Sequence, residues 1–451
     1  MKWNKVFLAA LLSLSLAIIS CDESDVGNPP NNGTVDATMY VAIGNSLTAG
    51  YASGSMYESA QKYSYPKLIA EQVGTSNFVQ PMFPEAGTGS KIVLKSLNPV
   101  TISADPIANN PPTNLTYPAP YNNLGIPGAI LYDAVDTSSA LSRAVSRSNP
   151  FYPYVMRDQN VFGKTLVDQA SKLRPTLITF WLGNNDVLGY ATSGGVKGTN
   201  LGLDGKPQFT LPTEVFWFER TLDTALARLR RSNPNATILI ANIPDVTSVP
   251  FFTTVPIKIP NPTNPTQLLS IYYKNNKAEV KAATTGDYVL LTAQTELGKG
   301  VGLMPTNPLA SNYVLDAEEA TIAKNAVSEF NQKIFTLAAK HKAKLVNVNA
   351  RMAEIKAGIK IAGESFNAGF ITGGVFSLDG VHPSAKGQGI IANEFIKVMN
   401  DQFGANIAYV NIASLPGLAA PSNKASAPGK YPSELYITPH VFDYTISLFA
   451  R

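Results

Sequence analysis

The sequence predicts an α/β fold, with helices packed on both faces of a parallel sheet. Short apolar runs rich in β-branched residues recur at 40–43, 176–181, 237–241 and 344–348. Stretches with helical spacing of apolar residues separate them, and this alternation is typical of right-handed parallel crossovers. Two of the runs end in polar, glycine-led turns, at the edge where α/β sheets place their ligands. With 45% hydrophobic and 15% charged residues, the 451-residue chain has the composition of a globular protein.

The first 20 residues have the layout of a secretory signal peptide rather than a transmembrane helix. Two lysines precede an apolar run at Val6–Ile19 that is short for a span, and the small Ser20 follows. Cys21 comes next, and the chain has no second cysteine to pair with it. Ala-Ile-Ile-Ser-Cys resembles the lipobox of bacterial lipoproteins, which implies that the signal is removed and Cys21 is acylated. The alternative is an ordinary signal peptide with an incidental cysteine.

Residues 21–37 are acidic and then rich in Gly, Pro and Asn, which is typical of a flexible tether. Acyl chains on Cys21 would hold the domain at a membrane surface. We therefore expect an exported lipoprotein of the bacterial outer membrane or cell surface, with the periplasmic face as the alternative. The net charge of +4 gives no argument for a nucleic-acid partner.

The first βα unit begins with the strand at 40–43, which delivers Ser46 to a turn. A helix is predicted over 56–74. Residues 75–122 contain many prolines and predict an irregular insertion. Within it, two β-like runs at 91–94 and 100–103 are expected to form a hairpin.

The next segment, 123–128, predicts a tight turn into a helix, with the backbone N–H of Gly128 exposed where anions are favoured. An apolar stripe over 162–173 predicts the helix before the second strand. Thr213 is expected to cap a helix whose apolar face runs to Leu229.

A second insertion is predicted at 246–312, with one helix near 267–281. It leaves the sheet close to the strand ends. Its aromatic residues either line a substrate pocket or pack the insertion's own small core. They include Phe251, Phe252, Tyr272, Tyr273 and Tyr288.

Helical signals dominate the last third of the chain. Asp316 and Glu319 form a capping pair that opens a long helix. Residues 350–361 predict another helix, and Ser384 caps the last one. The main domain is therefore placed at 38–402.

Residues 403–451 lack clear periodicity and predict an extension that wraps the domain. Two β-like runs stand out within it, at 407–412 and 434–437.

Four short motifs follow one another in a fixed order. They are Gly44-Asn-Ser-Leu47, Asn123 with Gly128 five residues later, Gly183-Asn-Asn-Asp186 and Asp379-Gly-Val-His382. Together they resemble the GDSL family of SGNH hydrolases, whose members cleave esters and related acyl bonds. The resemblance implies a three-layer α/β/α sandwich around a parallel sheet, in agreement with the strand and helix pattern.

The resemblance also implies roles that suit the chemistry of the residues. Ser46 would be the nucleophile, and it needs a base within about 3 Å. His382 would be that base, and Asp379 would orient its ring. The backbone N–H groups of Ser46 and Gly128 and the side-chain amide of Asn185 would form the oxyanion hole.

Four further residues have alternative interpretations: Asn45, Asp186 and the other two histidines. Asn45 stands where the family usually has aspartate, so this turn keeps its hydrogen bonds but loses a charge. Asp186 could replace Asp379 as the orienting residue, although it would more naturally cap the following turn. His341, at the end of a helix, and His440, in the tail, are expected to be structural.

The sequence thus predicts a serine esterase or lipase that acts through an acyl-enzyme, without metal or cofactor. Ser46 lacks the Gly-x-Ser-x-Gly elbow of the α/β-hydrolases, and no metal-ligand spacing or phosphate-binding loop is present. A carbohydrate O-acetylesterase and an acyltransferase share the mechanism and remain alternatives. A third alternative is a surface lipoprotein that only binds ligands, against which the intact motif set argues.

Overall fold

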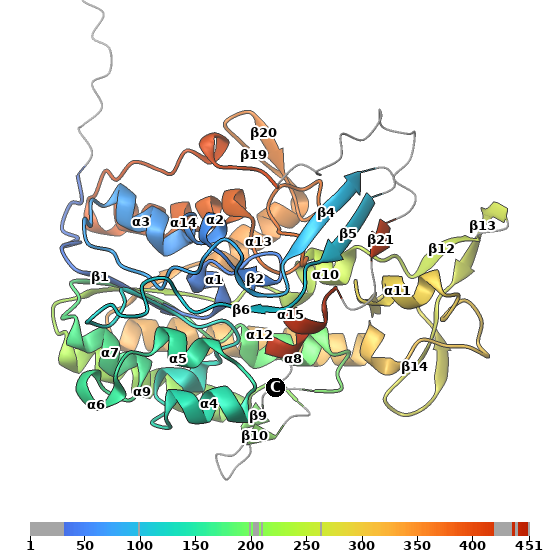
Figure 1. The fold of residues 1–451 in the computed structure, drawn as a ribbon, viewed down its shortest axis with the longest axis horizontal. Coiled ribbons are helices and arrows are strands. Elements are labelled where there is room, and N and C mark those ends of the chain that lie inside the picture. The colour runs from blue at the N-terminus through green and yellow to red at the C-terminus, as the bar shows by residue number, and fades with distance from the viewer. Residues whose placement is uncertain are drawn as a thin grey trace, which may run out of the picture.

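A five-stranded parallel sheet forms the centre of the molecule, in the order β18-β11-β8-β1-β7 (Figure 1). The computed structural model describes residues 31–97, 100–197, 200–201, 207–208, 211–261, 264–418, 435–437 and 441–449. The strands are β1 (Tyr40–Gly44), β7 (Asn123–Gly125), β8 (Leu177–Trp181), β11 (Thr237–Ala241) and β18 (Lys344–Val346). Residues of β1 and β8 are fully or almost fully buried, which explains their continuous apolar runs. The predicted α/β class is confirmed.

Helices cover both faces of the sheet, as the three-layer prediction requires (Figure 1). One layer contains α3 (Tyr65–Gln72), α13 (Val348–Ala357) and α14 (Ala385–Phe403). The opposite layer contains α7 (Leu166–Lys172), α9 (Val215–Ser232) and α12 (Ala317–Lys340). Stacked rings join helices within each layer: Tyr65 on Phe395, and Phe218 on Phe330.

Two of the three predicted helix caps form. The amide of Glu319 donates to Asp316 Oδ1 at 3.0 Å, and the amide of Gly387 donates to Ser384 Oγ at 3.1 Å. The prediction that Thr213 caps a helix is wrong, because Glu214 occupies the N-cap position of α9 and its side chain makes no capping hydrogen bond. The amide of Thr213 instead donates to the carbonyl of Asp186 at 2.9 Å.

The helix predicted over 56–74 is shorter than expected. Its first part forms β2 (Ser55–Met56) and α2 (Glu58–Gln61), and α3 begins only at Tyr65, with Pro66 in its first turn. In the insertion that follows, β4 (Ile92–Leu97) and β5 (Val100–Ala104) pair antiparallel, so the predicted hairpin is confirmed.

The helix predicted near 267–281 is wrong, because this segment forms two β-hairpins. They are β12 (Lys258–Asn261) with β13 (Asn264–Ser270), and β14 (Tyr272–Lys274) with β15 (Val280–Ala282). Ile271 and Tyr273 are buried while Tyr272 is less so, which is the two-residue period of a strand.

Three further segments differ from the prediction. The turn at 123–128 contains β7, a sheet strand, and only a 3₁₀ turn at Leu131–Ala134 follows it. The helix predicted at 350–361 begins at Val348 and stops before Gly358, whose φ is 95°. The run at 407–412 forms no strand, whereas β21 (Leu435–Ile437) pairs parallel with β5.

Residues 31–37, which the sequence assigns to the tether, lie against the end of α14. The amide of Thr34 donates to the carbonyl of Phe403 at 2.9 Å, and Val35 is buried. Among the described residues, no helix has the length and apolar character needed to cross a membrane.

The remaining elements are short. They are α1 (Ser46–Ala49), β3 (Thr88–Gly89), β6 (Ala108–Asn109), α4 (Ala140–Ser146), α5 (Phe151–Val155), α6 (Gln159–Phe162), α8 (Asn185–Thr192), β9 (Asn200–Leu201), β10 (Pro207–Gln208), α10 (Pro250–Thr253), β16 (Tyr288–Val289), α11 (Ala293–Gly298), β17 (Val314–Leu315), β19 (Ile359–Ile361), β20 (Glu364–Phe366) and α15 (Asp443–Phe449).

Candidate active site

Ser46 lies at the carboxyl end of β1, as the first residue of the short helix α1. Gly44 allows this close turn, because a Cβ added there would lie 1.9 Å from Thr48 Oγ1 and 2.9 Å from the carbonyl oxygen of Trp181. The side chain of Asn45 accepts a hydrogen bond from the amide of Leu47 at 3.1 Å. The turn therefore keeps its hydrogen bond with asparagine in place of aspartate.

Asp379 and His382 form a buried pair on the loop before α14. His382 Nδ1 lies 2.9 Å from Asp379 Oδ2, and both side chains are almost completely buried. The second carboxylate oxygen, Oδ1, accepts from the amides of Val381 at 2.9 Å and His382 at 2.8 Å. Burial alone would raise the pKa of Asp379, but the imidazole and these amides outweigh it and lower the pKa below its usual range.

The segment after α1 supports this pair, and sequence reasoning did not identify it. The amide of Gly54 donates to Asp379 Oδ2 at 3.1 Å. Ser53 exchanges hydrogen bonds with the histidine loop, through Ser377 Oγ at 2.9 Å and the amide of Leu378 at 3.1 Å. The positive φ of Ser53, 48°, is unusual for a serine, but nothing in the local sequence signals it.

Ser46, Asn185 and His382 line one cavity of about 80 Å³. Asp379 lies behind His382, on the side of the ring away from Nε2. Most of the remaining wall is apolar. It includes Leu47, Trp181, Leu188, Val246, Val249, Val348, Met352, Ile355, Val375, Phe376, Val381 and Ile391. Of the two alternatives for the insertion's aromatic residues, the structure favours packing: Phe251, Phe252 and Tyr273 are buried in the hydrophobic core and do not line this cavity.

Gly128 is not among the described residues that line this cavity, but its loop contacts Asn185. The Nδ2 atom of Asn185 donates to the carbonyl of Ala129 at 2.8 Å. Gly128 has a φ of 77°, and a Cβ there would lie 2.8 Å from Asn149 Nδ2 and from the carbonyl oxygen of Leu448. This position therefore requires glycine.

Asp186 does not act as the partner of the histidine. Its Oδ2 accepts from the amide of Leu131 at 2.7 Å, whereas Asp379 contacts the ring of His382. Burial raises the pKa of Asp186 to about 7.

The other histidine within the described residues, His341, ends α12 with Nε2 2.6 Å from Asp223 Oδ1, which fits its predicted structural role. His440 and Cys21 lie outside the described residues. The part of the chain that the structure describes contains no group of three His, Cys, Asp or Glu side chains suited to a metal ion.

Comparison with known proteins agrees with the motif order. The sequence model of the family described as GDSL-like Lipase/Acylhydrolase matches residues 40–395. No curated protein matches the chain.

Several solved structures resemble the chain over most of its length. A GDSL-like lipase of Parabacteroides merdae is 13% identical, with 82% of this chain and 99% of that chain covered and a TM-score of 0.35. An extracellular lipase of Streptomyces rimosus is 14% identical, with coverage of 81% and 99% and a TM-score of 0.33. A family 3 carbohydrate esterase of Clostridium thermocellum is 14% identical, with coverage of 82% and 98% and a TM-score of 0.30.

The family match extends over all four motifs, from β1, which precedes Ser46, to α14, which follows His382. The chain therefore belongs to the GDSL-like lipase/acylhydrolase family and is a serine ester hydrolase of the GDSL type.

Proposed function

We propose that this protein hydrolyses carboxylic esters through an acyl-enzyme formed on Ser46. The observation that carries the proposal is the buried Asp379–His382 pair, whose imidazole lines the same cavity as Ser46. His382 takes the proton of Ser46 as the hydroxyl attacks the ester carbonyl, and then gives it to the leaving alcohol. Water repeats the sequence on the acyl-enzyme and releases the acid.

We assign stabilisation of the negative charge that develops on the carbonyl oxygen to the backbone N–H of Ser46 and to Asn185 Nδ2, whose residues line the cavity, and to the N–H of Gly128, whose loop is hydrogen-bonded to Asn185. An amide nitrogen carries two hydrogens, so Asn185 can keep its bond to the Ala129 carbonyl and also donate to the oxyanion. Loss of one donor of this kind costs roughly 10²–10³ in rate.

The apolar cavity favours a short acyl group as the part of the substrate bound beside Ser46. Its volume is about 80 Å³. An apolar protein cavity of about 150 Å³ accepts benzene, so this one takes roughly half as many carbon atoms. Acetyl to butyryl esters are therefore the expected substrates. This size also suits O-acetyl groups on a carbohydrate, which is the second candidate function.

An ester panel tests both candidates. We expect the rate to peak between acetyl and butyryl p-nitrophenyl esters and to fall for long chains. Acetylated sugars test the alcohol side in parallel. Ser46→Ala should abolish hydrolysis while the thermal unfolding curve stays close to that of the wild type. Activity retained by this variant would defeat the proposal.

We also propose that the protein is exported and anchored to a membrane through acylated Cys21. The signal-like run before Cys21 and the match of Ala-Ile-Ile-Ser-Cys to a lipobox support this. Cys21→Ala should move the full chain from the membrane fraction to the soluble fraction. Unchanged membrane association would contradict the anchor.

A further inference from the structure

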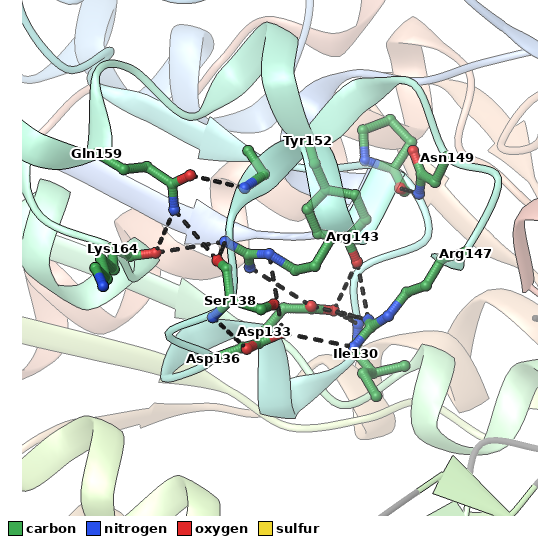
Figure 2. Close-up of polar contacts among 12 residues, drawn as sticks. Ile130, Asp133, Asp136, Ser138, Arg143, Arg147, Asn149, Tyr152, Gln159 and Lys164 are labelled. Atoms are coloured by element: carbon green, nitrogen blue, oxygen red, sulfur yellow. Dashed lines mark hydrogen bonds and ion pairs between the residues drawn. The ribbon is translucent and has the colours of Figure 1, made fainter. Parts of the chain in front are cut away.

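A buried charge cluster lies directly behind the Gly128 loop, which comprises residues 127–131. We define the Asp133 cluster as Asp133, Arg147 and Tyr152 (Figure 2). Arg147 Nη1 donates to both carboxylate oxygens of Asp133, at 2.8 and 2.7 Å, and the hydroxyl of Tyr152 donates to Oδ2 at 2.9 Å. The carboxylate of Asp133 is completely buried.

The cluster is joined to the loop by a backbone hydrogen bond. The amide of Ile130 donates to Asp133 Oδ2 at 2.8 Å, so one carboxylate oxygen meets the loop, the guanidinium and the phenol. Figure 2 shows Ile130, Arg147 and Tyr152 converging on this carboxylate.

Three further side chains hold the loop at successive backbone groups. Asn149 Nδ2 donates to the carbonyl of Pro127 at 2.7 Å, and Asn185 Nδ2 donates to the carbonyl of Ala129 at 2.8 Å. Asp186 Oδ2 accepts from the amide of Leu131 at 2.7 Å. Gly128 thus lies in a segment whose flanking groups are fixed on both sides.

We infer that Arg147 and Tyr152 are positioning residues for the oxyanion hole, acting through Asp133 and the Gly128 loop. The inference rests on the proposed function, because it takes Gly128 and Asn185 as the oxyanion donors. A shift of the loop would move the Gly128 N–H and, through the Ala129 carbonyl, the amide of Asn185. Neither Arg147 nor Tyr152 lines the cavity with Ser46.

Electrostatics explains why the buried carboxylate of Asp133 needs Arg147 and Tyr152 as partners. A buried carboxylate without a cation is costly, and here Arg147 is the hydrogen-bonded cation, while Nη1 of the buried Arg143 lies farther away, 3.7 Å from Oδ1. Burial would lower the pKa of Arg147, but Asp133 outweighs this and raises it, so the guanidinium stays charged. Lysine is not equivalent there, because the guanidinium meets two carboxylates at once: Nη1 contacts Asp133, and Nη2 lies 3.9 Å from Asp136 Oδ2.

The test compares Arg147→Lys and Tyr152→Phe with Arg228→Lys as the matched control. Arg228 forms an ion pair with Asp168 at 2.5 Å between α9 and α7, and the hydrogen bonds of the Asp168 carboxylate go to Arg228 and Thr165 rather than to the loop. The readouts are kcat and KM for p-nitrophenyl acetate, the inhibition constant of phenylboronic acid, and the melting temperature. Phenylboronic acid forms a tetrahedral anion on a nucleophilic serine, so its affinity reports on the oxyanion hole.

We expect kcat to fall by about tenfold to 100-fold in Arg147→Lys, with KM within about twofold, since small misplacements cost rates of this order. Phenylboronic acid should lose affinity in parallel. Tyr152→Phe keeps the ion pair and the ring, so it should fold normally and give a smaller loss of the same kind. Arg228→Lys should leave kcat and inhibitor affinity unchanged.

Two results would overturn the inference. One is that the Tyr152→Phe and Arg147→Lys variants both fold and both keep the kcat and the inhibitor affinity of the wild type. The other is a fall in kcat and inhibitor affinity that accompanies a lower melting temperature and is equally large in the Arg228→Lys control. If Ser46→Ala is inactive in the same assay, either result defeats only the positioning role. An active Ser46→Ala would defeat the proposed function itself.

Discussion

The ring of Tyr51 lies against the imidazole of His382, with ring centroids 4.7 Å apart and planes inclined by 53°. Tyr51 is completely buried and also meets Phe151 edge-on, at 6.2 Å between centroids. It therefore forms a wall that limits how the imidazole can turn. A second constraint on the ring is the hydrogen bond between Nδ1 and Asp379 Oδ2 at 2.9 Å.

Removal of this wall should lower the kcat of the folded enzyme, in addition to lowering the free energy of unfolding. Tyr51→Leu leaves space beside the imidazole, so we expect a fall in kcat and a loss of roughly 2–4 kcal/mol in the free energy of unfolding. Tyr51→Phe keeps the ring and is the matched control, with kcat near that of the wild type. Steady-state kinetics and urea unfolding measure the two effects. Equal kcat values for the leucine and phenylalanine variants would show that the ring contact has no catalytic consequence.

Asp379→Asn should preserve the loop and remove the charge that orients His382. The asparagine carbonyl oxygen can still accept from the amides of Val381 and His382. In a catalytic triad this change lowers kcat by about 10⁴, because the ring takes the wrong tautomer. The same substitution at Asp186, which contacts Leu131 rather than the histidine, is the comparison. A larger loss at Asp186 than at Asp379 would reverse the assignment of the orienting residue.

Enlarging the apolar cavity should shift the preference for acyl chains. Ile391 lines the cavity from α14, and Ile391→Ala should raise the rate on hexanoyl relative to acetyl esters. Ile334→Ala, at a buried position of α12 that does not line the cavity, is the control for a general loss of stability. Both substitutions should cost about 2–5 kcal/mol in the free energy of unfolding. An unchanged chain-length profile in Ile391→Ala would exclude the cavity as the acyl site.

The carboxyl group of Asp186 should make stability fall as the pH rises from about 4 to about 7. Its pKa is about 7 in the folded protein and about 3.9 in an unfolded chain. Between these values the native state holds a proton that the unfolded state has lost, so the free energy of unfolding decreases with pH and levels off above about 7. Asp186→Asn should reduce this slope, and the slope that remains should come from Glu319, whose pKa burial also raises to about 7. Urea unfolding at pH 4.5, 6 and 7.5 measures it.

The control for this pH dependence is Asp401→Asn, at a half-exposed residue that pairs with Lys397. Its profile should follow that of the wild type. A wild-type slope that persists in Asp186→Asn would mean that another group carries it.

Local patterns in the sequence were sufficient for the main framework. The buried strands β1, β8 and β11 follow from continuous apolar runs, since both faces of a central parallel strand are covered. The capping pair Asp316–Glu319 fixes the start of α12 through contacts only three residues apart. The motif Asp379-Gly-Val-His382 likewise brings carboxylate and imidazole together within one turn.

The second insertion shows where local patterns fail. Its segment 267–281 has apolar residues at spacings that suit a helix as well as a strand, and the partner strand decides between them. Tyr272 pairs with Ala282 and Lys274 with Val280, so the backbone bonds go to a neighbouring strand rather than along a helix. The edge strand β7 was missed for a related reason, since only its pairing with β1 makes three residues a strand.

The sequence by itself determined the α/β class, the order of the main elements and the identity of the candidate nucleophile, base and orienting carboxylate. Only the tertiary structure decided what surrounds them. The amide of Gly54 donates to Asp379 across 325 residues of chain, and Asp133, which lies outside the four motifs, accepts from the amide of Ile130 in the Gly128 loop. Such contacts depend on how distant segments pack, and the spacing of residues along a chain does not encode them directly.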